Sequence, residues 1–283
     1  GWTVDDNIQA PDAAKLAVHW FESKQNEVAA EVADLFSKYR LSEALMAVYK
    51  LFWDEFSSWY LEMIKPAYGQ GIDRTTYDAT LCFLDNLLHL LHPFMPFITE
   101  ELWQQMYERN AEEGESLMVS ALSMDTYVDT AFVAQFEVVK GVISNIRSIR
   151  LQKNIAQKEA LDLQVLGENP VAEFNAVIQK MCNLSSITVV ESKAEGASSF
   201  MVGTTEYAVP LGNMIDVEAE IARMEAELKH KEGFLQGVLK KLSNEKFVNN
   251  APAAVLEMER KKQADAESII SSLKESIAAL KKA

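Results

Sequence analysis

Two repeats of apolar residues near the end of the sequence restrict most strongly how this chain can fold. The first repeat runs in steps of four and three residues over 217–242, and residue 231 is its only polar position. Turn-forming residues at 243–252 interrupt it, and a second repeat follows over 256–280. Sustained repeats of this kind are typical of coiled-coil seams. They predict an antiparallel helical hairpin over residues 216–283, with a projecting first arm ~39 Å long.

Helical periodicity dominates the first part of the sequence, residues 1–125. Its strongest run extends from residue 41 to residue 63, and weaker runs cover residues 12–39 and 77–106. Because each run places its apolar residues on one face, we expect an antiparallel helical bundle. The apolar face of the strongest run is expected to consist of Leu41, Leu45, Val48, Phe52, Phe56, Trp59 and Met63.

Residues 126–215 change from a helical to an alternating pattern. Helices are expected over residues 132–151 and 174–181. Apolar and polar residues alternate in three short segments, which we interpret as the strands 161–165, 186–190 and 205–209. The sequence therefore predicts a mainly α fold with a small α/β unit, made of a helical bundle, a small α/β domain and a coiled-coil hairpin.

Charge is distributed unevenly along the chain. The formal net charge is −15, of which residues 1–125 carry −13, residues 126–215 carry −2 and residues 216–283 carry 0. Affinity for nucleic acid normally comes from Lys and Arg, so such an acidic chain can bind nucleic acid only locally, and we do not expect DNA as a partner. Residues 140–158 hold five basic and no acidic residues. This stretch could follow a phosphate backbone or offset neighbouring carboxylates.

Patterns that would indicate catalysis or metal binding are weak. His89 and His92 have the spacing of a metal pair, but no cluster of Cys, Asp or Glu supplies further ligands. Glu100 and Glu101 resemble an acid/base pair, yet a place in the first turn of a helix explains them better. We assign no catalytic residue and no metal site.

The cysteines and the hydropathy indicate the compartment. Cys82 and Cys182 lie in apolar helical patterns without paired spacing, so we expect buried thiols in a reducing, cytoplasmic environment. No apolar run reaches the ~18 residues of a membrane span. The start at Gly1, without an initiator Met, suggests a piece of a longer polypeptide.

Aromatic and charged residues gather where the strongest helical run ends. Trp53, Phe56, Trp59 and Tyr60 are followed by Glu62 and Lys65. Core packing explains most of these aromatics. A helix end with an aromatic ring, a carboxylate and an amine could also stack on and hydrogen-bond unstacked RNA bases.

Three segments resemble one family. Residues 92–103 (HPFMPFITEELW) resemble the segment that marks the anticodon-binding helical domain of the class I aminoacyl-tRNA synthetases for valine, isoleucine and leucine. Residues 52–66, with FWDEF, WYLE and KP in the expected order, resemble the same family. Residues 241–252 (KLSNEKFVNNAP) resemble the turn of the coiled coil in valyl-tRNA synthetases. The resemblance covers essentially the whole chain.

The resemblance implies where the chain touches tRNA. Anticodon bases are expected at Leu61 and Glu62, with Trp59 and Lys65 as supports. The hairpin is expected to lie along the outer corner of the L-shaped tRNA. Contacts to the tRNA backbone are expected at Arg147, Arg150, Arg223, Lys229, Lys240, Lys241 and Lys246.

The resemblance also implies a function. We expect the tRNA-recognition fragment of a valine-tRNA ligase, which binds valine tRNA and positions it for ATP-dependent aminoacylation. The catalytic and editing domains of the same polypeptide, and the family's first anticodon-domain helix, would lie outside this chain. The fragment alone is therefore expected to be non-catalytic, monomeric and without a cofactor, whereas the full-length enzyme would use ATP and magnesium. The alternative is an acidic helical scaffold whose coiled-coil arm binds a protein partner.

Overall fold

The computed structural model describes residues 3–106, 116–122, 124–211 and 217–243, with 256–260, 262–264, 266, 267, 270 and 274. The chain forms two compact units, Gly1–Pro210 and Leu211–Ala283. It is mostly helical and has a small mixed sheet, as the sequence predicts.

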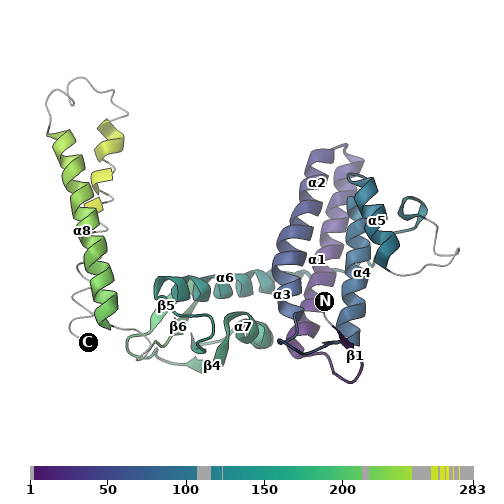
Figure 1. Ribbon diagram of the computed structural model, residues 1–283, viewed down its shortest axis with the longest axis horizontal. Coiled ribbons are helices and arrows are strands. Elements are labelled where there is room, and N and C mark those ends of the chain that lie inside the picture. Colours follow the sequence, from purple (N-terminus) through teal and green to yellow (C-terminus); the bar gives the residue numbers. More distant parts are fainter. Residues whose placement is uncertain are drawn as a thin grey trace. The chain divides into compact units, whose positions relative to one another are not determined.

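Helices fill the first part of the first unit, which we call the helical region. They are α1 (Asp12–Ser37), α2 (Leu41–Lys50), the π-helix η1 (Leu51–Tyr60), α3 (Leu61–Ile64), α4 (Arg74–Leu91) and α5 (Pro96–Met106). A short ladder of β1 (Val4–Asp5) and β2 (Ile72–Asp73) precedes α4, and η2 (Leu117–Val119) follows α5. Figure 1 shows α1, α2 and α4 side by side. The helices lie where the periodicity predicts them.

The segments α2, η1 and α3 form one uninterrupted helix over residues 41–64, because Lys50 and Leu61 at the junctions keep right-handed helical dihedral angles. In its π-helical part, Ser58 donates a hydrogen bond of 2.9 Å to the carbonyl oxygen of Trp53, five residues earlier. Turns of π-helix are rare in proteins, and those that are found often lie at functional sites.

The buried face of this helix differs from the predicted one. Leu41 and Leu45 were expected in the core but are 51% and 38% exposed. Leu51, which was not predicted, is buried together with the predicted Phe56, and the two residues are five positions apart. A strict α-helix would turn these two residues to different sides, whereas a π-helix aligns residues at this spacing. The predicted face is confirmed at Val48, Phe56 and Met63, and it missed Leu51 and Tyr60 because it assumed α-helical geometry in the π-helical part.

An aromatic cluster forms the core of the helical region. The ring centroid of Phe21 on α1 lies 5.2 Å from that of Phe56, 5.0 Å from that of Tyr60 and 5.1 Å from that of Phe83. Tyr60 is fully buried, and its hydroxyl lies 2.8 Å from Thr80 Oγ1. Contacts between aromatic rings stabilise a core by more than the burial of their apolar surface alone. They fix the 41–64 helix against α1 and α4.

The second part of the first unit is a small α/β layer. Its elements are α6 (Thr130–Gln152), β3 (Leu161–Leu166), η3 (Ala172–Phe174), α7 (Asn175–Cys182), β4 (Leu184–Val190), β5 (Ser198–Val202) and β6 (Thr205–Val209). The strand order is β4-β3-β6-β5, with β3 and β4 parallel and the other pairs antiparallel. The three predicted strands are confirmed, but β5 was not predicted.

Helices α6 and α7 connect the sheet to the helical region. Helix α6 lies close to β5 at Gly141. A Cβ atom added at this glycine would lie only 3.0 Å from Val202 Cγ1. Helix α7 packs against β4 on one side and against α1 and α3 on the other. The α/β layer is therefore part of the same compact unit as the helical region.

In the second unit, α8 (Val217–Leu242) is the long helix. Val238 on α8 is buried, as are Ala266 and Ile270 from the following segment. Two ion pairs join the segments: Glu232 to Lys274 at 2.8 Å and Lys241 to Glu259 at 3.7 Å.

Of the two cysteines, which were both expected to be buried, only Cys182 is buried. Cys82 is exposed, because its position on α4 faces away from the core.

In the part of the chain that the structure describes, no helix is both long enough and apolar enough to traverse a bilayer.

Candidate nucleic-acid interface

The C-terminal end of the 41–64 helix brings together three of the four residues expected at the anticodon site. Leu61 and Glu62 lie in α3, and Lys65 is the residue at which the chain leaves the helix. The Lys65 ammonium lies 3.3 Å from Glu62 Oε1, and both side chains are about half exposed, at 54% and 51%. The helix end therefore presents an amine and a carboxylate to solvent beside the partly buried Leu61.

A groove of 530 Å³ follows this helix end. It is lined by Thr3 and residues 65–70. Tyr68, in the turn at Gly69, is fully exposed beside the groove. Tyr68 was not among the predicted site residues, although a tyrosine in a turn next to Lys65 and Pro66 has no helical face on which to be buried. The groove adds an aromatic ring to the charged pair.

Trp59 is partly buried against α6. The centroid of its ring lies 6.0 Å from that of Phe136 of α6, in an edge-to-face arrangement, and two cations lie near the ring. The guanidinium of Arg147 is 5.7 Å from the ring centroid and the ammonium of Lys140 is 5.8 Å from it. Cations attract the faces of aromatic rings, so these contacts bind the helix end to α6. Trp59 is placed to support the helix end, and Arg147 remains exposed.

Lys140 shows that part of the basic stretch offsets carboxylates. Its side chain is 13% exposed, and its ammonium lies 2.6 Å from Glu55 Oε2 and 2.8 Å from Glu137 Oε1. It also lies 5.3 Å from the ring centroid of Trp20. Lys140 therefore joins α6 to η1 and α1.

Arg150, an expected phosphate contact, lies inside the protein. The residue is 2% exposed. Its guanidinium donates to the carbonyl oxygens of Ala156 at 3.0 Å, Cys182 at 2.7 Å and Asn183 at 3.2 Å. The side chain is thus engaged with the backbone around the end of α7 and is not presented to a ligand.

Lys180 is a residue that the sequence analysis did not select. It extends from α7 to α3, where its ammonium donates a hydrogen bond of 2.6 Å to the carbonyl oxygen of Met63. Burial around the ammonium lowers the pKa of Lys180, although the nearby charge of Glu62 opposes this effect. Only the tertiary fold brings Lys180 and Met63 together, because 117 positions separate them in the sequence.

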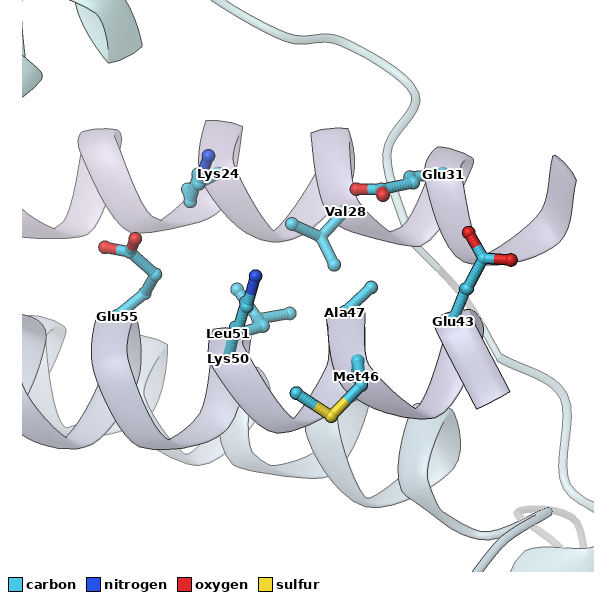
Figure 2. A pocket seen from close by; sticks show the side chains of 9 residues that line it. All are labelled: Lys24, Val28, Glu31, Glu43, Met46, Ala47, Lys50, Leu51 and Glu55. Carbon is cyan, nitrogen blue, oxygen red and sulfur yellow. The ribbon is translucent and has the colours of Figure 1, made fainter. Parts of the chain in front are cut away.

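A second groove lies between α1 and the 41–64 helix (Figure 2). It encloses 370 Å³, and Figure 2 shows apolar Val28, Ala47 and Leu51 between charged side chains. The charged residues that line it are Lys24, Lys50, Glu31, Glu43 and Glu55. Because carboxylates outnumber amines there, this groove does not favour phosphate, and we assign it no ligand.

On α8, Lys229, Lys240 and Lys241 are exposed. Lys241 also forms the ion pair with Glu259 described above. Arg223 belongs to α8, but its side chain lies outside the described part, and Lys246 lies wholly outside the described residues. Three of the five expected hairpin contacts are therefore positioned on the surface of one helix.

The two histidines considered as a metal pair have other partners. His89 Nε2 lies 2.8 Å from Ser120 Oγ, and His92 Nδ1 lies 2.8 Å from Thr99 Oγ1. Over the described ranges, the structure contains no group of three or more His, Cys, Asp or Glu side chains that could hold a metal ion. Glu100 accepts hydrogen bonds from Ser116 Oγ at 2.9 Å and from the Leu117 amide at 3.0 Å, so it joins α5 to η2.

Sequence comparison defines the class of protein to which this arrangement belongs. A model of the anticodon-binding domain of tRNA ligases matches residues 18–165, more than half of the chain. The chain therefore belongs to the family of tRNA ligases with this anticodon-binding domain. A model of the valyl tRNA synthetase tRNA-binding arm matches residues 216–281, which include α8. The resemblance found in the sequence is confirmed.

The relatives are valine–tRNA ligases. The chain is 99% identical over its whole length to the one from Bacteroides thetaiotaomicron and 72% identical to the one from Phocaeicola vulgatus. It is 34% identical to the one from Enterococcus faecalis, over 99% of the chain. The chain spans about a third of these relatives, 32% of the first two and 33% of the third.

Proposed function

We propose that this chain is the tRNA-recognition part of a valine-tRNA ligase and binds both the anticodon and the outer corner of valine tRNA. One observation carries the proposal: an anticodon-binding domain and a tRNA-binding arm match successive parts of the same chain. The exposed pair of Glu62 and Lys65 supports the first contact, and the exposed lysines of α8 support the second.

At the anticodon, unstacked bases would meet the end of α3. Proteins read such bases by stacking and by hydrogen bonds to their edges. Leu61 would supply an apolar contact, Glu62 would accept hydrogen bonds from base amino groups, and Lys65 would donate to base or phosphate oxygens. Trp59 would support the turn from inside, and Tyr68 would offer a ring for stacking. The helices around this site would form the antiparallel bundle of the family.

At the outer corner, the second unit would act as an antiparallel coiled-coil hairpin. Its support is the order of the ion pairs, because residue 232 pairs with 274 whereas residue 241 pairs with 259. Lys229, Lys240 and Lys241 would contact phosphates there, together with Arg223 and Lys246. Arg147, on α6 of the first unit, would also contact the tRNA backbone. Arg150 we assign instead to stabilising the α/β layer.

The three proposed domains are the bundle at 1–125, the connecting helix with the α/β domain at 126–215 and the hairpin at 216–283. Catalytic and editing domains, with ATP and magnesium, belong to the remaining length of the relatives, and the present chain positions the tRNA for them. It is expected to act in the cytoplasm, to be monomeric and to be non-catalytic alone. Correct placement of a bound reactant can itself lower a reaction barrier by several kcal/mol, about 7–11 in favourable cases.

Binding of three RNAs by fluorescence anisotropy tests the proposal. The RNAs are a transcript of valine tRNA, the same transcript with its middle anticodon base replaced, and a tRNA for another amino acid. We expect the chain to bind the first most tightly, and Glu62→Gln to reduce its preference over the second. Equal affinity for all three RNAs would overturn the proposal and favour the acidic protein-binding scaffold, for which the charge of −13 over residues 1–125 is the supporting observation.

A further inference from the structure

One face of the 41–64 helix is held by three cations from the α/β layer. The contacted residues, Glu55, Trp59 and Met63, follow one another at intervals of four positions. Their partners are Lys140, Arg147 and Lys180, in the same order along the chain. The first two partners belong to α6 and the third to α7.

The Lys180 contact differs from the other two because it lies at the end of the helix. The last carbonyl groups of any helix lack partners within the helix, and they carry its partial negative charge. Met63 is completely buried in the last turn, and its carbonyl oxygen accepts a hydrogen bond from the Lys180 ammonium at 2.6 Å. A hydrogen bond from a charged donor is stronger than one between neutral groups. Lys180 thus caps the helix from another part of the chain.

The capped turn is the one that carries the candidate base-reading residues. Leu61 and Glu62 directly precede Met63, and Lys65 follows it by two positions. At Lys65 the backbone changes to ψ 122° and leaves the helix, so the turn has no further helical residues to hold it. A shift of the Met63 carbonyl would therefore move the backbone of Leu61 and Glu62.

We propose that Lys180 is a positioning residue for anticodon recognition, which acts from α7 by fixing the last turn of α3. This inference rests on the proposed function. Lys180 as a whole is exposed, but its ammonium already donates to the carbonyl oxygen of Met63, so a direct phosphate contact would have to compete with that hydrogen bond. The α/β layer then contributes to specificity and is more than a spacer between bundle and hairpin.

Two substitutions and one control test the inference in the full chain. Lys180→Met removes the ammonium but keeps an apolar stem, whereas Lys180→Arg keeps a charged donor. Lys193→Met is the matched control, because Lys193 belongs to the same layer and its ammonium is also hydrogen-bonded, to Glu206 at 2.7 Å. Both Met variants remove one positive charge, so their long-range electrostatic effects are comparable.

The measurement is the ratio of affinities for valine tRNA and for the transcript with the altered middle anticodon base, at two salt concentrations. We expect Lys180→Met to reduce this ratio about tenfold, as loss of a charge-assisted hydrogen bond implies, with the salt slope unchanged. Lys180→Arg should retain most of the ratio, and Lys193→Met all of it. Circular dichroism and a thermal melt check the folding of each variant, and Lys180→Arg keeps the test valid if Lys180→Met unfolds.

Two results would overturn the inference. Equal weakening of both RNAs by Lys180→Met, with a salt slope smaller by about one, would identify a phosphate contact instead. An unchanged ratio would show that Lys180 has no part in recognition. If the unsubstituted chain does not discriminate between the two RNAs, the proposed function fails as well, and this result is distinct from the other two.

Discussion

Arg150 of α6 donates a hydrogen bond of 2.7 Å to the carbonyl oxygen of Cys182, the last residue of α7. The next residue, Asn183, has a left-handed backbone with φ 50°, so α7 ends there. The buried guanidinium therefore replaces the hydrogen bonds that the end of α7 lacks. A residue that looks like a phosphate contact in the sequence thus holds two helices together.

Arg150→Met should lower the free energy of unfolding by about 3 kcal/mol, because it leaves the carbonyl group of buried Cys182 without this charged donor and removes the bonds to Ala156 and Asn183. Urea denaturation measures this change. Arg147→Met is the control, since Arg147 is exposed and its contact with Trp59 is worth about 0.5–1 kcal/mol. Equal losses for the two variants would contradict the structural role of Arg150.

Lys140→Met should destabilise the chain by about 3 kcal/mol, because it leaves the carboxylate of Glu55, 18% exposed, without its partner. Adding Glu55→Gln should recover part of this loss, since the unpaired charge is then removed. The exposed pair of Lys15 and Asp12 is the control, and Lys15→Met should cost less than about 1 kcal/mol. A double variant that is as unstable as Lys140→Met alone would argue against the charge pair as the cause.

The two thiols should react differently with a thiol reagent. Burial raises the pKa of the Cys182 thiol to about 12, so this group should react only after unfolding. Cys82 is exposed, but partial desolvation and the charges of Asp85 and Glu22 raise its pKa, so it should react more slowly than a free thiol. Thiol titration before and after addition of denaturant checks this, with Cys82→Ser as the control. Labelling of two thiols in the folded chain would contradict it.

Glu100 should make stability depend on pH. Desolvation raises its pKa, but hydrogen bonds from Gln104, Ser116 and the Leu117 amide outweigh this effect, and the pKa is lowered from 4.5. Its stabilising contribution is therefore present above that value and is lost as the pH falls through the lowered pKa of the folded state. Denaturation of wild type and Glu100→Gln over this range should give curves that converge towards low pH. A constant difference would argue against the carboxylate as the cause.

Sequence patterns predicted most of the helices but not the π-helical geometry within one of them. From Val48 onwards, the apolar residues recur at intervals of three and four positions, which indicates a helix. That Leu51 and Phe56, five positions apart, share the buried face is known only from the packing of the aromatic core. Strand β5 was missed because Ser198 and Ser199 begin it with two polar residues, and its pairing with β6 supplies what the pattern lacks.

The candidate site was predictable where it is continuous in sequence. Leu61, Glu62 and Lys65 lie within two turns, so a helix end alone brings them together. The roles of Lys140, Arg150 and Lys180 depend on partners that are distant in the chain, such as Glu55, Cys182 and Met63. No local pattern indicates which basic side chains will be engaged by such contacts and which will remain available for RNA.

Filter binding of valine tRNA at two salt concentrations tests the central claim most directly. The variant is Lys240→Glu with Lys241→Glu. Its control is Lys15→Glu with Lys38→Glu, which changes the net charge equally at exposed positions, one in the first turn of α1 and one directly after its last residue. We predict that salt weakens tRNA binding by the unsubstituted chain and by the control to the same degree. At low salt the α8 variant should bind tRNA at least about tenfold more weakly than the unsubstituted chain, and its affinity should depend less steeply on salt. Binding that is indifferent both to the α8 substitutions and to salt would contradict the account.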